Sequence, residues 1–250
     1  ALCIYVYLLS VVSSEVSGAL KDFLKDFFQM MIQIQTLVLL ALICKAFSVC
    51  DIPDRSVLMM RLSEWLAQVE NGCGDINTWD VSKVRDFSSL FSGWDTFNAD
   101  ISNWDMSNAE NVANMFYGAT SFNQPIGSWD VSSVTDMSFM LNGTEFNQDI
   151  SNWNVSNVID MNHMFTGCYS FNQPIGEWDV SNVTEMNFMF ENCLAFNQDI
   201  SGWNVSNAER MIGMFSCSPQ FNSTFNQDIS GWNVSNVTAM QSMFSHAAAF

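Results

Sequence analysis

The chain has 250 residues, 48% of them hydrophobic and 14% aromatic, and a formal net charge of −18 at pH 7. This apolar content suffices for a packed core in one or two domains and argues against disorder. Because contacts with phosphate need clustered Lys and Arg, the acidity argues against nucleic acid and against an anionic membrane surface as partners.

Residues 1–50 form a leader region that contains two apolar runs. The run 2–12 is shorter than the roughly 20 apolar residues that span a bilayer as a helix. The segment 30–48 has the layout of a secretory signal peptide, with an apolar centre at 36–44 and the small residues Ala46 and Ser48 before a cleavage site. Its first residues carry no positive charge, so an N-terminal membrane anchor and a buried helical hairpin stay open as alternatives.

Residues 51–75 are predicted to form an N-terminal capping helix. Asp54 can cap its N-terminus, and Asn71 with Gly72 can end it. The apolar residues of this segment fall on one face at helical spacing: Val57, Leu58, Leu62, Trp65, Leu66 and Val69. Because the first coil of a repeat stack exposes the edge of its core, we expect this face to cover that edge. The alternative is that it binds a partner helix.

Residues 76–250 contain seven copies of one unit of about 25 residues, the last of them incomplete. The copies are marked by the repeat tryptophans Trp79, Trp104, Trp129, Trp153, Trp178, Trp203 and Trp232. Such a period predicts a solenoid, in which each unit buries its apolar face against its neighbours. The longer step before the seventh copy comes from the segment 216–224, which we expect to lengthen one loop.

The repeat predicts an α/β solenoid similar to a leucine-rich repeat. Ile, Trp and Val recur at odd spacing around each repeat tryptophan, which predicts one short strand per unit and a short parallel β-sheet. Further along the fifth copy, Val183, Met186 and Met189 have the spacing of helical or 3₁₀ turns on the other side. The alternative is an all-β solenoid, because this Asn- and Ser-rich segment has low helix propensity.

The repeat also resembles a known family. Its cleanest copy, 175–199, reads IGEWDVSNVTEMNFMFENCLAFNQD. This string resembles the repeat of the BspA-like leucine-rich-repeat surface proteins, which is also found in mycoplasma surface lipoproteins, and the resemblance covers 76–250. It implies a secreted or surface-anchored protein with no catalytic activity, whose solenoid is offered to binding partners.

The acidic residue after the repeat tryptophan is a candidate metal ligand. Oxygen-bearing side chains stacked at steps of roughly 5 Å could hold Ca²⁺, which takes six to eight oxygen ligands. The candidates are Asp80, Asp105, Asp130 and Asp179. The alternative is structural, because Asp, Asn and Ser at corners accept hydrogen bonds from backbone N–H groups. No other metal and no cofactor is predicted.

Two kinds of covalent modification are also predicted. Cys168 and Cys193 occupy the same place in adjacent copies, where equivalent Cα atoms lie about 4.8 Å apart, so they form a disulfide in an oxidising compartment or stay small buried residues in a reducing one. Asn142 and Asn222 begin Asn-x-Thr sequons, which are acceptors for N-glycosylation in a eukaryotic secretory route.

The function predicted is non-catalytic. The two histidines, His163 and His246, are more than three copies apart, and His163 holds a variable position expected at the surface. We expect a secreted or cell-surface module for adhesion or for interaction with a protein or a glycan. The alternative is a structural spacer or cell-coat element without a specific ligand. Residues that depart from the repeat consensus would mark a binding face, and they include Arg85, Trp94, Tyr117, Tyr169 and Arg210.

The seventh copy has no cap in the sequence after it. Its apolar residues, among them Phe244, would face water unless another coil covers them. We therefore expect the natural chain to continue beyond Phe250, and we expect end-to-end self-association of the 250-residue form.

Overall fold

A computed structural model of the chain describes residues 50–68 and 72–250. The predicted signal peptide at 30–48, with its membrane-anchor alternative, lies outside the described residues. Among the helices that are described, none combines the length and the hydropathy that crossing a bilayer requires. The described residues belong to one compact unit.

The N-terminal part of this unit is a helix between two short strands. Strand β1 (Cys50–Asp51) pairs in parallel with β2 (Trp79–Asp80), and the 3₁₀ helix η1 (Ile76–Thr78) leads directly into β2. Helix α3 (Arg55–Leu66) begins where the Asp54 side chain accepts a hydrogen bond from the Val57 N–H (3.0 Å). This bond satisfies one of the N–H groups that have no partner inside the first turn of a helix.

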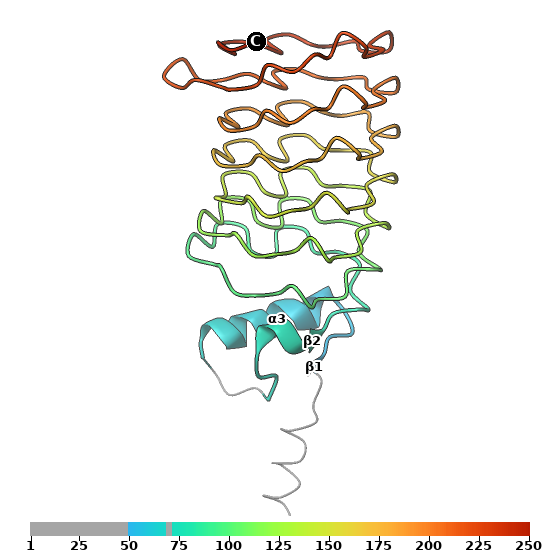
Figure 1. Cartoon of the computed structure of the whole chain (residues 1–250). Coiled ribbons are helices and arrows are strands. Elements are labelled where there is room, and N and C mark those ends of the chain that lie inside the picture. The colour runs from blue at the N-terminus through green and yellow to red at the C-terminus, as the bar shows by residue number, and fades with distance from the viewer. Residues whose placement is uncertain (1–49, 69–71) are drawn as a thin grey trace, which may run out of the picture. The chain divides into compact units, whose positions relative to one another are not determined.

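Helix α3 packs on the first coil of the stack that follows (Figure 1). Leu58 and Leu62 are fully buried, whereas Leu66, which was expected on the same face, is exposed. The Arg55 guanidinium donates to the carbonyl oxygens of Asp86 (3.0 Å) and Ser88, so the helix also supplies donors to backbone groups at the edge of the coil.

After α3 the backbone winds into coils that lie one above the other (Figure 1). Neighbouring coils are joined by parallel β-bridges at one repeat position: Asp86↔Asn111, Asn111↔Asp136, Asp136↔Asp160, Asp160↔Glu185, Glu185↔Arg210 and Arg210↔Ala239. Around each bridge every second N–H donates to the next coil, as when Met186 donates to the Arg210 carbonyl (2.9 Å) and Phe188 to the Ile212 carbonyl (2.8 Å). Each coil is therefore held to the next by its backbone.

The predicted strand is observed at the tryptophan of the first copy, as β2, but the hydrogen-bonded ladder between the coils lies in a different part of the repeat. Around the tryptophans of the later copies the chain turns: the Trp153 N–H donates to the Ile150 carbonyl (3.1 Å), three residues earlier. The ladder instead runs through the segment that was expected to be helical, where the Met189 N–H donates back to Met186 (3.4 Å) and Phe188 has a φ of 55°. Apolar residues three positions apart are found in such turns as well as in a helix. The spacing alone therefore does not distinguish the observed turns from the helical segment that was predicted. The α/β leucine-rich-repeat class and its all-β alternative stay predictions.

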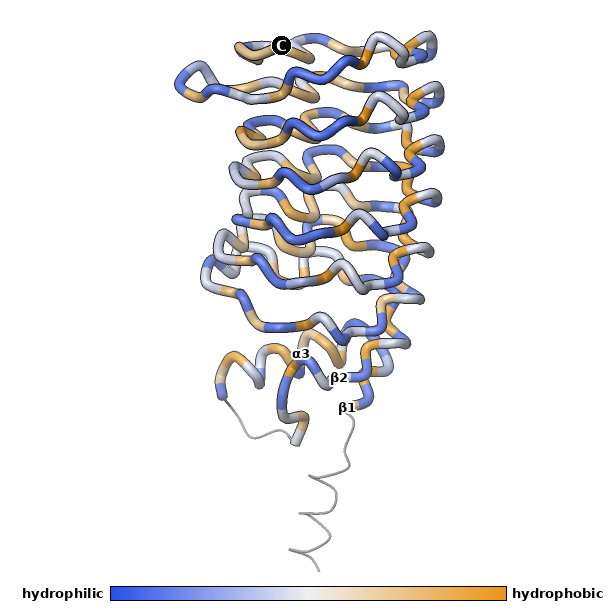
Figure 2. Tube along the Cα trace, in the orientation of Figure 1, coloured by the Kyte–Doolittle hydropathy of each residue, from blue (hydrophilic) through white to orange (hydrophobic). Residues whose placement is uncertain are grey.

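Hydrophobic residues recur at similar places in successive coils (Figure 2), and the side chains of the buried ones form the core. Phenylalanines stack along the axis, for example Phe165 on Phe190 (ring centroids 5.6 Å apart). Each repeat tryptophan from Trp104 on is nearly or fully buried, and its indole N–H donates to a carbonyl of the preceding coil, as Trp153 Nε1 does to Ile126 (3.1 Å). The stack is therefore stabilised by apolar burial and by buried hydrogen bonds at every step.

Candidate functional site

The four acidic residues proposed for Ca²⁺ all make local turns. The carboxylate of Asp80 accepts from the N–H of Ser82 (3.1 Å) and from its hydroxyl (2.7 Å). Asp105, Asp130 and Asp179 each accept from the N–H two residues later (3.0 Å). Among the described residues there is no group of three or more His, Cys, Asp or Glu side chains that could hold a metal ion. These carboxylates thus have the structural role that was the alternative to Ca²⁺.

The disulfide of the described region is not the predicted one. Cys50 is bonded to Cys73, with their Cα atoms 4.9 Å apart, so Cys50 has no free thiol and helix α3 is enclosed in a covalent loop. Cys168 and Cys193 are buried free thiols. Cys168 Sγ donates to the Leu141 carbonyl (2.9 Å) and Cys193 Sγ to the Phe165 carbonyl (3.1 Å). Because both thiols point toward the preceding coil, they do not converge on one another as a disulfide requires.

The two sequons differ in accessibility. Asn222 is exposed in the segment 216–224, which projects beyond the loops of the neighbouring coils (Figure 1). Asn142 is only partly exposed, and Thr144 of its sequon is 3% exposed and donates its hydroxyl to the Leu141 carbonyl (2.7 Å). Asn222 is therefore the better acceptor for a glycan.

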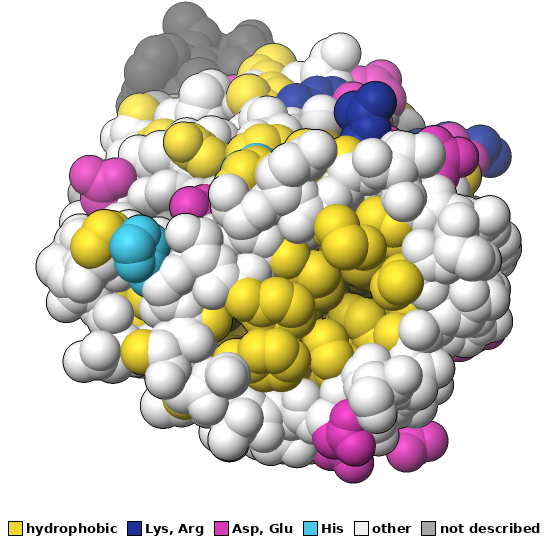
Figure 3. Space-filling model, turned by 90° about the horizontal axis from the view of Figure 1, so that it is seen from above, with side chains coloured by type: hydrophobic (Ala, Val, Ile, Leu, Met, Phe, Trp, Pro, Cys, Tyr) yellow, Lys and Arg dark blue, Asp and Glu magenta, His cyan; other side chains and the backbone are white. Residues whose placement is uncertain are grey.

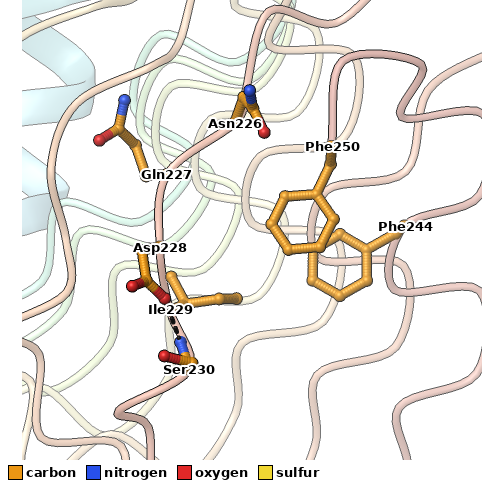
Figure 4. A pocket seen from close by; sticks show the side chains of 7 residues that line it. All are labelled: Asn226, Gln227, Asp228, Ile229, Ser230, Phe244 and Phe250. Carbon is orange, nitrogen blue, oxygen red and sulfur yellow. Dashed lines mark hydrogen bonds between the residues drawn. The ribbon is translucent and has the colours of Figure 1, made fainter.

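The C-terminal end of the stack presents apolar side chains (Figure 3). Phe244 and Phe250 stack with ring centroids 4.1 Å apart, and Phe250 is 51% exposed. With Ile229 they form the apolar side of a shallow depression of about 480 Å³ (Figure 4). Its polar side is formed by Asn226, Gln227, Asp228 and Ser230. This face is the edge of the core of the last coil.

A second feature lies on the side of the stack. Three consecutive coils place the rings of Phe139, His163 and Phe188 one above the other at the same repeat position, and we call these three residues the aromatic row. The ring centroids of Phe139 and His163 are 4.4 Å apart, and those of His163 and Phe188 are 4.8 Å apart. All three side chains are partly exposed. The Tyr117 ring meets Phe139 edge-on (6.2 Å) and is 44% exposed, which extends the row into a fourth coil.

The backbone of the aromatic row has an unusual conformation for such residues. Phe139, His163 and Phe188 have φ values of 57°, 56° and 55°. Left-handed backbone is uncommon for bulky side chains and costs on the order of 1 kcal/mol or more per residue. The same position holds smaller residues in the other coils: Ser89, Asn114, Gly213 and Ser242. The stack requires left-handed backbone at this position, because the N–H group of the residue donates to a carbonyl of the next coil. It does not require an aromatic side chain at this position.

The next coil makes room for the end of the row. A Cβ atom added at Gly213 would lie 2.4 Å from Cε1 of Phe188, so the ring occupies space that only glycine leaves open. The end of the aromatic row therefore depends on two residues that differ from the other copies: the large ring of Phe188 in one coil and Gly213, without a side chain, in the next.

The central histidine supplies the polar atom of the row. The Thr166 hydroxyl donates its one hydrogen to the Phe188 carbonyl (2.6 Å), so His163 Nδ1, 3.2 Å from the same oxygen, is the donor in that contact. Burial lowers the pKa of His163, which keeps the ring neutral at pH 7. Nε2 is then a hydrogen-bond acceptor, and it has no hydrogen bond within the described residues. The row thus combines apolar ring edges with one central acceptor.

The sequence predicts only part of this site. Tyr117 was expected to mark a binding face, but His163 was expected to be a variable surface residue, and the two phenylalanines were not predicted to belong to a site. The signal was available, because Phe139 and Phe188 stand where other copies carry Ser, Asn or Gly. The other departures lie elsewhere: Arg85 pairs with Glu110 (2.5 Å) and Arg210 with Glu185 (3.7 Å).

These coils define a repeat protein whose units are joined by backbone hydrogen bonds. The chain belongs to the family described as Mycoplasma protein of unknown function, DUF285, which matches residues 60–150, 127–224 and 176–250. No curated protein and no solved structure matches the chain. The three overlapping matches include all seven repeats, so the family assignment rests on the stack.

Proposed function

We propose that this protein is a non-catalytic interaction module, displayed outside the cell, that uses the aromatic row to bind a protein or a glycan. The observation that carries the proposal is the presence of aromatic side chains at three consecutive left-handed positions. The fold requires left-handed backbone at this position, but it does not require bulky side chains there. Aromatic residues that remain at such strained positions point to a function of their side chains. Aromatic side chains are also enriched at binding surfaces, where they provide large contact area with little loss of conformational freedom.

The chemistry of the row suits ligands with both apolar and polar groups. Ring edges of Phe139 and Phe188 offer apolar contact, while His163 Nε2 accepts a hydrogen bond from a hydroxyl or an N–H group. Both glycans and protein surfaces provide such groups.

An extracellular or cell-surface location is part of the proposal. The Cys50–Cys73 disulfide supports it, because disulfides persist in oxidising compartments. The resemblance of the repeat to BspA-like surface proteins supports the same location. Adhesion is the corresponding role, and a spacer or cell-coat element without a specific ligand is the competing function.

Binding of the whole chain to glycan and protein arrays tests this proposal. The test variant carries Phe139→Asn and Phe188→Asn, because Asn is the natural residue at the same place in the second coil and adopts left-handed backbone readily. The control is Tyr169→Asn, which removes an exposed aromatic ring outside the row. We expect ligands of the natural chain to be lost by the test variant, and retained by the control.

Two outcomes contradict the proposal. Equal binding by the natural chain and the test variant would exclude the aromatic row as the contact surface. A natural chain that binds nothing above background would leave the spacer function in its place. Thermal unfolding of the test variant separates these results from a loss of folding.

A further inference from the structure

A groove on the side of the stack crosses the second to fifth coils and is separate from the aromatic row. It encloses about 660 Å³ and is lined by Glu110, Ser133, Thr135, Asn157, Ile159, Asn182 and Thr184. These residues form two columns, four and six positions after successive repeat tryptophans. We call this feature the lateral groove. Its span of three coil steps is roughly 15 Å, which an extended peptide covers with about five residues.

The stack uses hydrogen-bond donors from both walls of the lateral groove. The amide groups of Asn157 and Asn182 each donate through Nδ2 to a serine carbonyl of the preceding coil (2.7 Å). The hydroxyls of Ser133 (2.9 Å) and Thr135 (3.2 Å) donate to the preceding coil in the same way. Each hydroxyl thereby donates its only hydrogen, and each amide donates one of its two N–H hydrogens. The hydroxyl and amide oxygens can still accept hydrogen bonds. The walls therefore offer more acceptors than donors.

The stretch of chain that contains the lateral groove is negative, and Glu110 is the one charged residue of the lining. Residues 86–209 contain sixteen Asp and Glu and no Lys or Arg. The nearest cations in the chain flank this stretch: Arg85 pairs with Glu110 at one end (2.5 Å), and Arg210 pairs with Glu185 at the other (3.7 Å). A surface with one sign of charge attracts ligands of the opposite sign and excludes those of the same sign.

One wall contains an apolar residue. Ile159 is 50% exposed, although the equivalent residues of the coils on either side, Thr135 and Thr184, are polar. Its position between them provides an apolar contact in the middle of an acceptor-rich surface.

We propose that the lateral groove binds an extended, basic segment of a partner protein. Lys and Arg carry only donors, three and five N–H groups, so they match walls that offer more acceptors than donors. An apolar side chain of the same segment would rest on Ile159. A neutral glycan is a poorer match, because each of its hydroxyls has to donate as well as accept. The proposal is independent of the aromatic row, since it rests on another surface and another ligand.

The test uses fluorescence anisotropy with the full chain and a labelled heptapeptide that alternates Lys and Val. Matched peptides replace Lys with Glu or with Ser. The test variant is Thr135→Lys, which places a positive charge in the groove. Its control is Thr238→Lys, which makes the same charge change at the same repeat position outside the groove, where the threonine also donates to the preceding coil (3.1 Å). Thr184→Lys provides a second groove variant if Thr135→Lys folds poorly.

We expect the Lys peptide to bind and the Glu peptide not to bind. Thr135→Lys should weaken binding about tenfold, and Thr238→Lys less than about twofold at 0.15 M salt, where screening limits distant charges. Ile159→Thr, the residue of the neighbouring coils, should weaken it by a smaller factor.

Three results would overturn the proposal: no binding of the Lys peptide, equal binding of the Ser peptide, or equal losses in Thr135→Lys and Thr238→Lys. The last result would mean that only the net charge of the chain attracts the peptide. Failure here leaves the aromatic row untouched, because the array variants do not alter the groove.

Discussion

Replacing Trp153 with Phe tests how the coils are held together. Trp153 is buried in a central coil, stacks on Trp178 (ring centroids 6.3 Å apart) and donates its indole N–H to the Ile126 carbonyl (3.1 Å). Phe keeps an aromatic ring in the column but removes the donor and part of the ring volume.

Two terms set the expected loss of stability. A buried hydrogen bond contributes about 1 kcal/mol net. The Ile126 carbonyl still accepts from the Trp129 N–H (3.1 Å), so the larger penalty of an unpaired buried oxygen does not apply. The smaller ring leaves a void, which adds about 1 to 2 kcal/mol. Trp153→Phe should therefore lower the free energy of unfolding by about 2 to 3 kcal/mol.

The measurement is urea unfolding followed by circular dichroism. Trp94→Phe is the matched control, because Trp94 is only partly buried, packs edge-on against Phe91 (5.3 Å) and donates no indole hydrogen bond within the described residues. We expect the control to lose less than about 1 kcal/mol. Equal losses in the two variants would refute the role assigned to the repeat tryptophans.

Reduction of the Cys50–Cys73 disulfide should lower the free energy of unfolding by about 3 kcal/mol, as the chain entropy of its loop predicts. Hydrogen exchange in α3, with and without reductant, measures this, and a Cys73→Ser variant should not respond to reductant. Because burial lowers the pKa of His163, the unfolded chain takes up the proton first, so stability should fall as the pH drops below about 6.5. His163→Asn should lack this part of the pH dependence in urea titrations at pH 5 and 7. The apolar end face with Phe244 and Phe250 should make this 250-residue chain associate at tens of micromolar, and Phe250→Asp should reduce that association in sedimentation velocity. A monomer under these conditions would contradict the prediction.

The period of the repeat and the buried columns could be read from the sequence. Side chains such as Ile150, Trp153 and Val155 recur in every unit, and a column of apolar residues at fixed spacing has to face the common interior of the stack. The structure buries all three. The Asp54 cap could also be predicted, because a capping bond is local and needs only the residue before the helix and the N–H groups that follow.

The structure decided where the backbone ladder runs and what the surface columns do. The ladder around Glu185 runs through left-handed residues such as Phe188, and side-chain spacing carries no information on the sign of φ. The aromatic row joins three different copies, and the role of His163 Nε2 as an acceptor depends on the hydroxyl of Thr166. The free thiol of Cys168 depends likewise on the direction of its side chain, not on the distance between coils. Side chains from different copies come into contact only when the coils are stacked. Residues that differ between the copies at one repeat position can therefore be recognised as a common site only in the tertiary structure.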